Sequence, residues 1–199
     1  METLELVLSA CLGIGLAAAA GFRVFVPPLI LGIAIRLGVP ATDVAPDWLG
    51  SWIAIAVFAV AAVVEVGAYY VPWLDNALDT VASPLAVLSG VLLTAGMTSE
   101  LHPVAQWSLA IVAGGGAAGI TQTASVFTRA LSSATTGGLA NFLVSTVELV
   151  CAIAAAVLTL LFAPLAIVML VGFVVWLRRV YVRRRAAKAR QRALLVAGA

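Results

Sequence analysis

The sequence predicts an all-α fold, a polytopic transmembrane helical bundle with about six crossings. Of its 199 residues, 63% are hydrophobic and only 10% are charged, whereas a soluble domain has roughly 25% charged residues. Several apolar stretches also exceed the roughly 18 residues that mark a transmembrane helix. The length suits one bundle, so we expect a single transmembrane domain over residues 1–181 and a basic tail over residues 182–199.

The first apolar stretch, Leu4–Gly38, is too long for one crossing. Its 35 residues would form a helix about 50 Å long, against a hydrocarbon core of about 30 Å. Residues 4–20 are interpreted as a retained crossing, because no basic residue of a secretory signal precedes them. We expect the two adjacent prolines to break the helix within residues 21–28. Residues 29–37 would then be a half-helix that dips into the membrane and returns.

Two further crossings complete the first half. Residues 49–71 form the second crossing and contain Glu65. Asp75 is expected to cap the next helix, residues 77–97. Asp79 falls on the same helix face as Asp75.

The second half begins with another 35-residue segment, 103–137. It contains the triple glycine 114–116, interpreted as a site of close helix packing, and then turns polar. A second non-helical break is therefore expected within residues 121–138. Residues 139–180 form 42 mostly apolar residues, which a tight hairpin near Pro164 would divide into two crossings.

The order of these parts repeats between the possible halves 4–97 and 103–181. Each half opens with a long segment expected to break and continues with a crossing that carries one glutamate. The tripeptide Ala-Ala-Gly at 19–21 recurs at 117–119. Inverted repeats with discontinuous helices are a transporter architecture, and the two breaks would approach the interior from opposite faces. Chance matches in a biased composition are the alternative.

Charge asymmetry predicts the orientation. The net charge is only +2, but eight of the eleven basic residues lie between Arg178 and Arg192. The positive-inside rule places this end in the cytoplasm, and six crossings put the N-terminus there too. Ala41 and Glu100 would then lie outside, and Tyr69 would be an interfacial anchor. Besides the bilayer, the tail is expected to meet anionic lipids rather than nucleic acid.

A lone carboxylate inside an apolar helix is a functional-site hypothesis by default. Asn141, Ser145 and Glu148 are spaced i, i+4, i+7 and share one face of such a helix. Glu65 is expected at a similar depth, roughly 10–14 Å from the cytoplasmic ends of the two crossings. The candidate substrate-binding or ion-coupling residues are Glu148, Glu65, Arg129, Arg23, Asn141, Asp75 and Asp79.

Each candidate has two interpretations. Glu148 would be protonatable and able to couple to a proton gradient if it lacked a partner, or charged and structural if it paired with Arg129. Arg23 could bind a phosphate or carboxylate from the outer side, or extend toward the lipid headgroups. Asp75 and Asp79 could hold a divalent ion together with a lipid phosphate, or simply complement the helix dipole.

Motifs for catalysis are missing from the sequence. It has no GxSxG, no phosphate-binding GxxxxGK[ST], and no His/Cys/Asp cluster with the spacing of metal ligands. His102 is interpreted as a surface residue, and Cys11 and Cys151 as small hydrophobic residues within apolar runs. We therefore expect no catalytic residue, no bound metal and no cofactor.

Three segments resemble a known family. GFRVFVPPL, YYVPWLDNALDTVASP and SSATTGGLAN are similar to the bacterial membrane proteins grouped as domain of unknown function 4126. The resemblance covers Leu4 to about Gly172 and leaves out the basic tail. It implies a bacterial inner-membrane location and no established activity.

The sequence therefore favours a small transporter or flippase with a polar intramembrane site. One alternative is a membrane-embedded enzyme that acts on a lipid headgroup through Asp75 and Asp79. The other is a structural or assembly protein without a substrate. A polar cavity, a metal-binding acid pair or a dry packed interior would distinguish these three.

Overall fold

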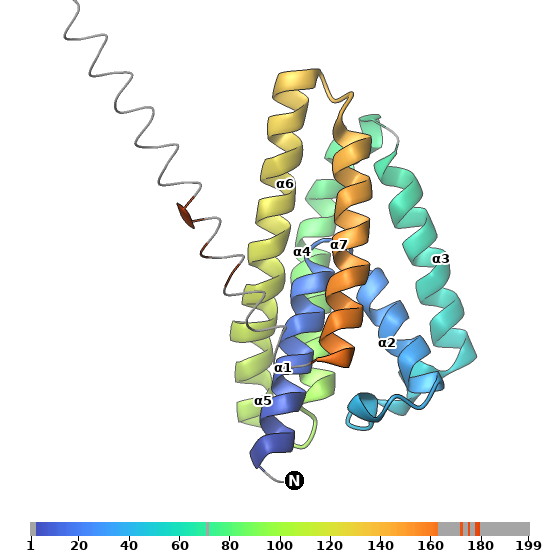
Figure 1. Cartoon of the computed structure of the whole chain (residues 1–199), viewed down its shortest axis with the longest axis vertical. Coiled ribbons are helices and arrows are strands. Elements are labelled where there is room, and N and C mark those ends of the chain that lie inside the picture. Colours follow the sequence, from blue (N-terminus) through green and yellow to red (C-terminus); the bar gives the residue numbers. More distant parts are fainter. Residues whose placement is uncertain (1–2, 71, 163–171, 173–174, 176–177, 180–199) are drawn as a thin grey trace, which may run out of the picture. The chain divides into compact units, whose positions relative to one another are not determined.

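The computed structural model describes residues 3–70 and 72–162 and four single positions, residues 172, 175, 178 and 179; the side chains of residues 72–78 are not described. The chain divides into two compact units, Met1–Ile167 and Val168–Ala199, and every helix below belongs to the first (Figure 1). The α-helices are α1 Thr3–Ala20, α2 Val26–Arg36, α3 Trp52–Tyr69, α4 Pro72–Met97, α5 Pro103–Leu109, α6 Gly116–Thr136 and α7 Asn141–Leu161. Short helical turns are η1 Pro40–Thr42, η2 Asp47–Gly50 and the π-helical η3 Ala110–Gly115.

This part of the chain is helical and contains no strand, so the predicted all-α bundle is confirmed. Five helices in it are long and apolar enough to cross a membrane, and one of these runs without interruption through α5, η3 and α6. The hairpin expected near Pro164 and nearly all of the last crossing and basic tail lie outside the described residues.

The first long segment does break, as expected, but not at its prolines. Helix α1 ends at Ala20, the chain turns through Gly21–Phe25, and α2 begins at Val26. Pro27 and Pro28 lie in the first turn of α2, where a missing N–H costs nothing. Glycine at position 21 lets α6 lie directly against this turn, since a Cβ there would overlap the Thr121 hydroxyl.

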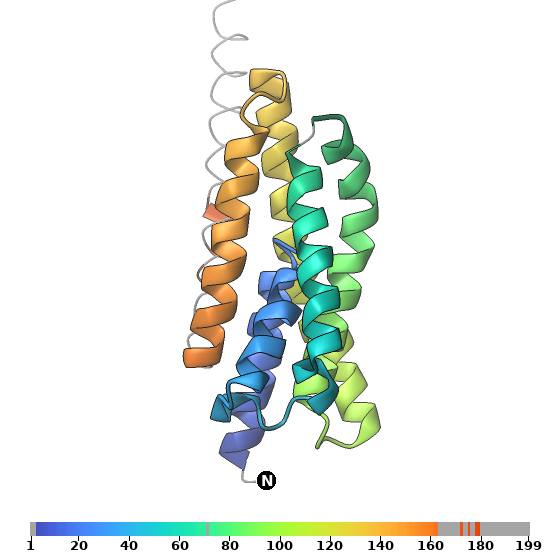
Figure 2. The ribbon, with the colours of Figure 1, turned by 90° about the vertical axis from the view of Figure 1, so that its right-hand side faces the viewer.

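This turn makes α1 and α2 a re-entrant hairpin. Helix α1 runs into the bundle from the end where the N-terminus lies, and α2 returns toward that end (Figures 1 and 2). The N-terminus, the η1–η2 connection and the turn before Pro103 all lie at this end. The expectation that the N-terminus and Ala41 face opposite sides of the membrane stays a prediction, because α1 is itself long and apolar enough to cross a membrane.

The second break is confined to the end of its expected range, because residues 121–136 are helical. Residues 103–136 form one continuous helical segment, and it ends only at Gly137 and Gly138, whose φ angles are 64° and 88°. Its polar side chains are compatible with a helix because their hydroxyls bond to the preceding turn: Thr123 Oγ1 donates to the Gly119 carbonyl at 2.7 Å. No break therefore divides residues 103–136. The inverted repeat stays a prediction, because most of the last crossing of its second half lies outside the described residues.

Helix α4 also begins earlier than expected. It starts at Pro72, a residue suited to a first helical turn, so Asp75 lies inside the first turn and is not the N-cap. The side chain of Asp75 lies outside the described residues. The triple glycine does allow close packing, since a Cβ at Gly114 would overlap the Thr94 side chain and the Gly90 carbonyl of α4.

Helix α1 lies at the centre of this unit and packs against α2, α4, α6 and α7. Leu16, Ala17, Ala19 and Ala20 are completely buried, and the small side chains let neighbouring helices approach closely. Through this packing the bundle holds the turn at Gly21–Phe25 deep in its interior, against four other helices.

Candidate functional site

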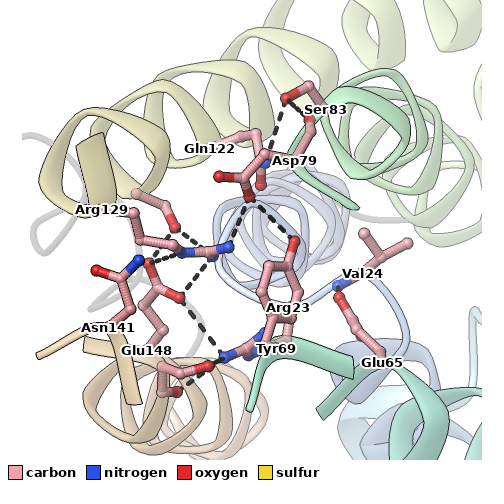
Figure 3. Close-up of polar contacts among 12 residues, drawn as sticks. Arg23, Val24, Glu65, Tyr69, Asp79, Ser83, Gln122, Arg129, Asn141 and Glu148 are labelled. Carbon is pink, nitrogen blue, oxygen red and sulfur yellow. Dashed lines mark hydrogen bonds and ion pairs between the residues drawn. The ribbon is translucent and has the colours of Figure 1, made fainter. Parts of the chain in front are cut away.

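Five side chains meet where the α1–α2 turn enters the bundle (Figure 3). They are Arg23 from the turn, Tyr69 from α3, Asp79 from α4, Arg129 from α6 and Glu148 from α7. We call these residues the charged centre. Four of them are buried, and the side chain of Asp79 is only 12% exposed. Segments up to 125 positions apart in the sequence (23 to 148) thus place two arginines and two carboxylates together in an apolar bundle.

Arg129 is the most fully engaged member. Its Nη1 lies 2.6 Å from Asp79 Oδ1, and its Nη2 lies 2.6 Å from Glu148 Oε2. Its Nε donates to Glu148 Oε1 at 3.2 Å, and Nη2 also donates to Ser125 Oγ at 2.9 Å. Every guanidinium nitrogen of Arg129 therefore has an anionic or polar partner, as a buried cation requires.

Glu148 faces the interior, as its spacing with Asn141 and Ser145 predicted. All three residues are buried. The carboxylate accepts hydrogen bonds from Arg129 Nη2 and from Ser125 Oγ. Of the two interpretations of Glu148, the structure therefore has the one in which Arg129 is its partner. Arg23 Nη2 also approaches the same carboxylate, at 3.6 Å.

Arg23 is completely buried but only partly engaged. Its Nη2 donates to the carbonyl and the hydroxyl of Ser145 at 2.8 and 2.5 Å. Its Nε and Nη1 have no hydrogen-bond partner among the residues that the structure describes. Both sequence interpretations of Arg23, a headgroup contact and an outer-side anion site, placed it near a membrane surface. The headgroup contact is wrong, because the turn carries the side chain inward to α7. Anion binding by Arg23 stays a prediction.

Tyr69 is the residue that sequence reasoning missed, because aromatic residues at helix ends are typical interfacial anchors. It is 3% exposed. Its ring lies against both guanidinium groups, with centroid distances of 4.2 Å to Arg23 and 3.9 Å to Arg129, and its hydroxyl donates to Asp79 Oδ1 at 3.3 Å. Desolvated cation–π contacts of this kind contribute about 2 kcal/mol each. One signal was available: Tyr69 follows Glu65 by four residues and so shares its helix face.

Glu65 binds backbone N–H groups and is not one of the five residues of the charged centre. Its Oε1 accepts from the backbone N–H of Val24 at 2.8 Å, and its Oε2 accepts from the N–H of Phe25 at 3.1 Å. These are the donors left open just before α2, where a carboxylate also complements the helix dipole. Glu65 therefore anchors the turn that carries Arg23.

The proposed acidic metal pair gains no support from Asp79. Its Oδ1 is bound to Arg129, and the part of the chain that the structure describes contains no group of three His, Cys, Asp or Glu residues placed to hold a metal ion. His102 is exposed and accepts from the Val104 N–H at 3.4 Å at the start of α5. Both cysteines are unpaired.

Comparison with known protein families shows which family the chain belongs to. A family model described as Domain of unknown function (DUF4126) matches residues 10–184. The chain belongs to this family. The DUF4126 match includes the whole charged centre and continues to Arg184, so it reaches further into the basic region than the resemblance suggested. No curated protein and no solved structure gives a significant match to the chain.

Proposed function

We propose that this membrane protein is a transporter whose charged centre binds a small solute with a carboxylate or phosphate group. The observation that carries this proposal is Arg23, a completely buried arginine with Nε and Nη1 unpartnered within the described structure. It lies at the tip of a re-entrant hairpin, and discontinuous helices supply the substrate sites of many transporters.

The chemistry of Arg23 selects the solute class. A buried polar donor without an acceptor costs about 1–3 kcal/mol, so two such donors favour a ligand that satisfies both. Carboxylate and phosphate oxygens match the planar fork of a guanidinium in a bidentate manner. Tyr69 lies against the face of this guanidinium, which leaves its edge for the solute.

Glu148 is the coupling group of the proposed cycle. Its carboxylate lies 3.6 Å from Arg23 but 2.6 Å from Arg129. An incoming anion can therefore replace Glu148 as the partner of Arg23, while Glu148 keeps its closer contact with Arg129. The anion then adds a negative charge beside Glu148, and uptake of a proton by the centre offsets that charge. Release of the solute restores the Arg23–Glu148 contact.

A second candidate is a structural or assembly role. The dense contacts of Arg129 with Asp79 and Glu148 favour it, because such a network also joins α4, α6 and α7 without any ligand. The two candidates differ in what they require of Arg23: transport requires an anion at its free edge, whereas a structural role does not.

The proposed setting is the bacterial inner membrane, with the basic segment between Arg178 and Arg192 in the cytoplasm. The positive-inside rule supports this orientation. Anionic lipid headgroups are the proposed partners of this segment.

Anion-dependent unfolding tests the proposal. Purified protein in uncharged maltoside micelles is heated with inorganic phosphate, sulfate, acetate or chloride at constant ionic strength. Binding to the folded state raises Tm in a saturable manner. At least one oxyanion should stabilise the unaltered protein and Arg36→Gln but not Arg23→Gln. Arg36 is a matched control because it is exposed and stacks on Trp52 at 4.7 Å.

Uptake of the same radiolabelled anion into proteoliposomes then separates transport from binding. Counterflow by the unaltered protein and by Arg36→Gln, with none by Arg23→Gln, is the expected result. Equal Tm shifts in Arg23→Gln, no shift with any anion, or binding without uptake would each contradict the transport proposal.

A further inference from the structure

A groove between α3 and α4 leads to the residues that anchor the hairpin. Its volume is about 570 Å³, and its floor is formed by Val24, Phe25 and Glu65. This size falls within the range of about 300–1,000 Å³ that is typical of ligand sites. Among the residues that the structure describes, the walls are alanine, valine and leucine side chains, including Val60 of α3 and Leu85 of α4.

The polar atoms of the groove floor already have partners. The N–H groups of Val24 and Phe25 donate to Glu65. The carbonyl of Val24 accepts from Ser89 Oγ at 3.2 Å, and that of Phe25 accepts from the Leu29 N–H at 3.2 Å. A polar solute would find little to bind there, so the groove suits an apolar ligand.

The surroundings supply such a ligand. Both α3 and α4 are long and apolar enough to cross a membrane, and α3 is the least buried of the five such helices, with 28% of its span buried. The wall residues Val57, Val60, Val64 and Val81 are exposed at the rim of the groove. In a membrane this rim meets lipid hydrocarbon, which is present at far higher concentration than any other apolar molecule.

We propose that this groove binds an acyl chain of a membrane phospholipid, independently of the transported solute. The chain covers the turn at Val24 and Phe25 and keeps water away from the hydrogen bonds of Glu65. Exclusion of water strengthens those bonds. The bound lipid thereby holds the re-entrant hairpin in place.

Photo-crosslinking tests this site. The full chain is placed in phosphatidylcholine nanodiscs that contain a phospholipid with a diazirine in one acyl chain, and labelled peptides are mapped. Labelling should concentrate on the groove walls. Ala61→Trp fills the groove from α3 and should abolish this labelling, whereas Val63→Trp, on the same helix but outside the groove and 72% exposed, should retain it.

A second variant keeps the test valid if Ala61→Trp does not fold. Leu85→Trp fills the groove from α4 and should give the same loss, and near-ultraviolet circular dichroism reports whether each variant keeps its packing. The proposal is overturned if a folded Ala61→Trp or Leu85→Trp variant is labelled as strongly as the unaltered protein. It is equally overturned if labelling is uniform around α3, or if crosslinks show the groove filled by a second copy or by residues 163–180.

Discussion

The two segments 4–38 and 103–137 have the same length, 35 residues, but the second is richer in serine, threonine and glutamine, and the two fold differently. The first turns back on itself at Gly21, whereas the second runs as one helix to Thr136. Each nevertheless brings one arginine to the same carboxylate of Glu148.

The two arginines come from different kinds of backbone, and they differ in how many of their guanidinium nitrogens have partners. Arg129 extends from a continuous helix, and all of its guanidinium nitrogens are engaged. Arg23 extends from a turn and uses only Nη2. Under the proposed function this difference is a division of tasks, in which Arg129 holds the charged centre together and Arg23 keeps donors for a ligand.

The largest expected difference between the two segments is in membrane topology. Because the first segment is a hairpin, an N-terminal tag and reporters fused after Ala41 and Glu100 should all report the same compartment. A reporter after Gly137 should report the opposite one, since the second segment crosses. Cysteine accessibility in intact cells and in inverted vesicles checks both. A tag and an Ala41 reporter on opposite sides would show that α1 crosses the membrane completely.

Loss of Arg129 should have the largest effect on stability. Arg129→Gln leaves Glu148 and Asp79 without their closest cation, and breaking a buried pair in this way costs about 3–5 kcal/mol. Chemical unfolding in detergent measures the change, with Arg36→Gln as the control. A loss of less than about 1 kcal/mol, the scale of an exposed ion pair, would show that Arg129 does not hold the centre together.

The repeated Ala-Ala-Gly tripeptides offer a matched pair of glycines. Gly21→Ala places a Cβ into Thr121 and the Ala118 carbonyl, whereas a Cβ at Gly119 has its nearest neighbour, Val87, at 3.6 Å. Overpacking typically costs about 1–3 kcal/mol, so Gly21→Ala should lower Tm clearly. Gly119→Ala should leave Tm unchanged or raise it, because alanine favours a helix. Equal responses would mean that the hairpin tip is not packed against α6.

Glu65 should matter somewhat less. Glu65→Gln keeps the shape but replaces one carboxylate oxygen with an amide that cannot accept, so one of the two N–H groups loses its partner. The expected cost is about 1–3 kcal/mol. Hydrogen exchange should show faster exchange of the amides around Val24 and Phe25 while α6 is unaffected. Unchanged exchange at these amides would contradict the anchoring role.

Much of the bundle could be predicted from the sequence, because periodicity and length follow directly from helix geometry. The inward face of Asn141, Ser145 and Glu148 is an example. The sequence left open whether Glu148 pairs with Arg129, and the structure shows that it does. The polar stretch of the second segment was misread for a local reason. Its threonine hydroxyls bond to carbonyls within the same helix, as Thr123 does, so they do not interrupt it.

The rest depends on tertiary contacts that no local pattern contains. The helix ends just before Gly21, where α6 packs too closely for a Cβ, and the prolines lie inside the next helix. Arg23 points inward because Ser145, on a helix 122 positions away, accepts its hydrogen bonds. Tyr69 stacks on two arginines that approach it from different segments. Such contacts become visible only once the helices are placed together.

The most direct test of the division of tasks is the unfolding free energy of Arg23→Gln, measured beside Arg129→Gln in the absence of added oxyanions. The lost contacts with Ser145 and Tyr69 are offset by removing a buried charge that has two unpaired donors. The change should therefore stay within about 1 kcal/mol of the unaltered protein. A loss from Arg23→Gln as large as that from Arg129→Gln would show that both arginines are structural, and would contradict the account.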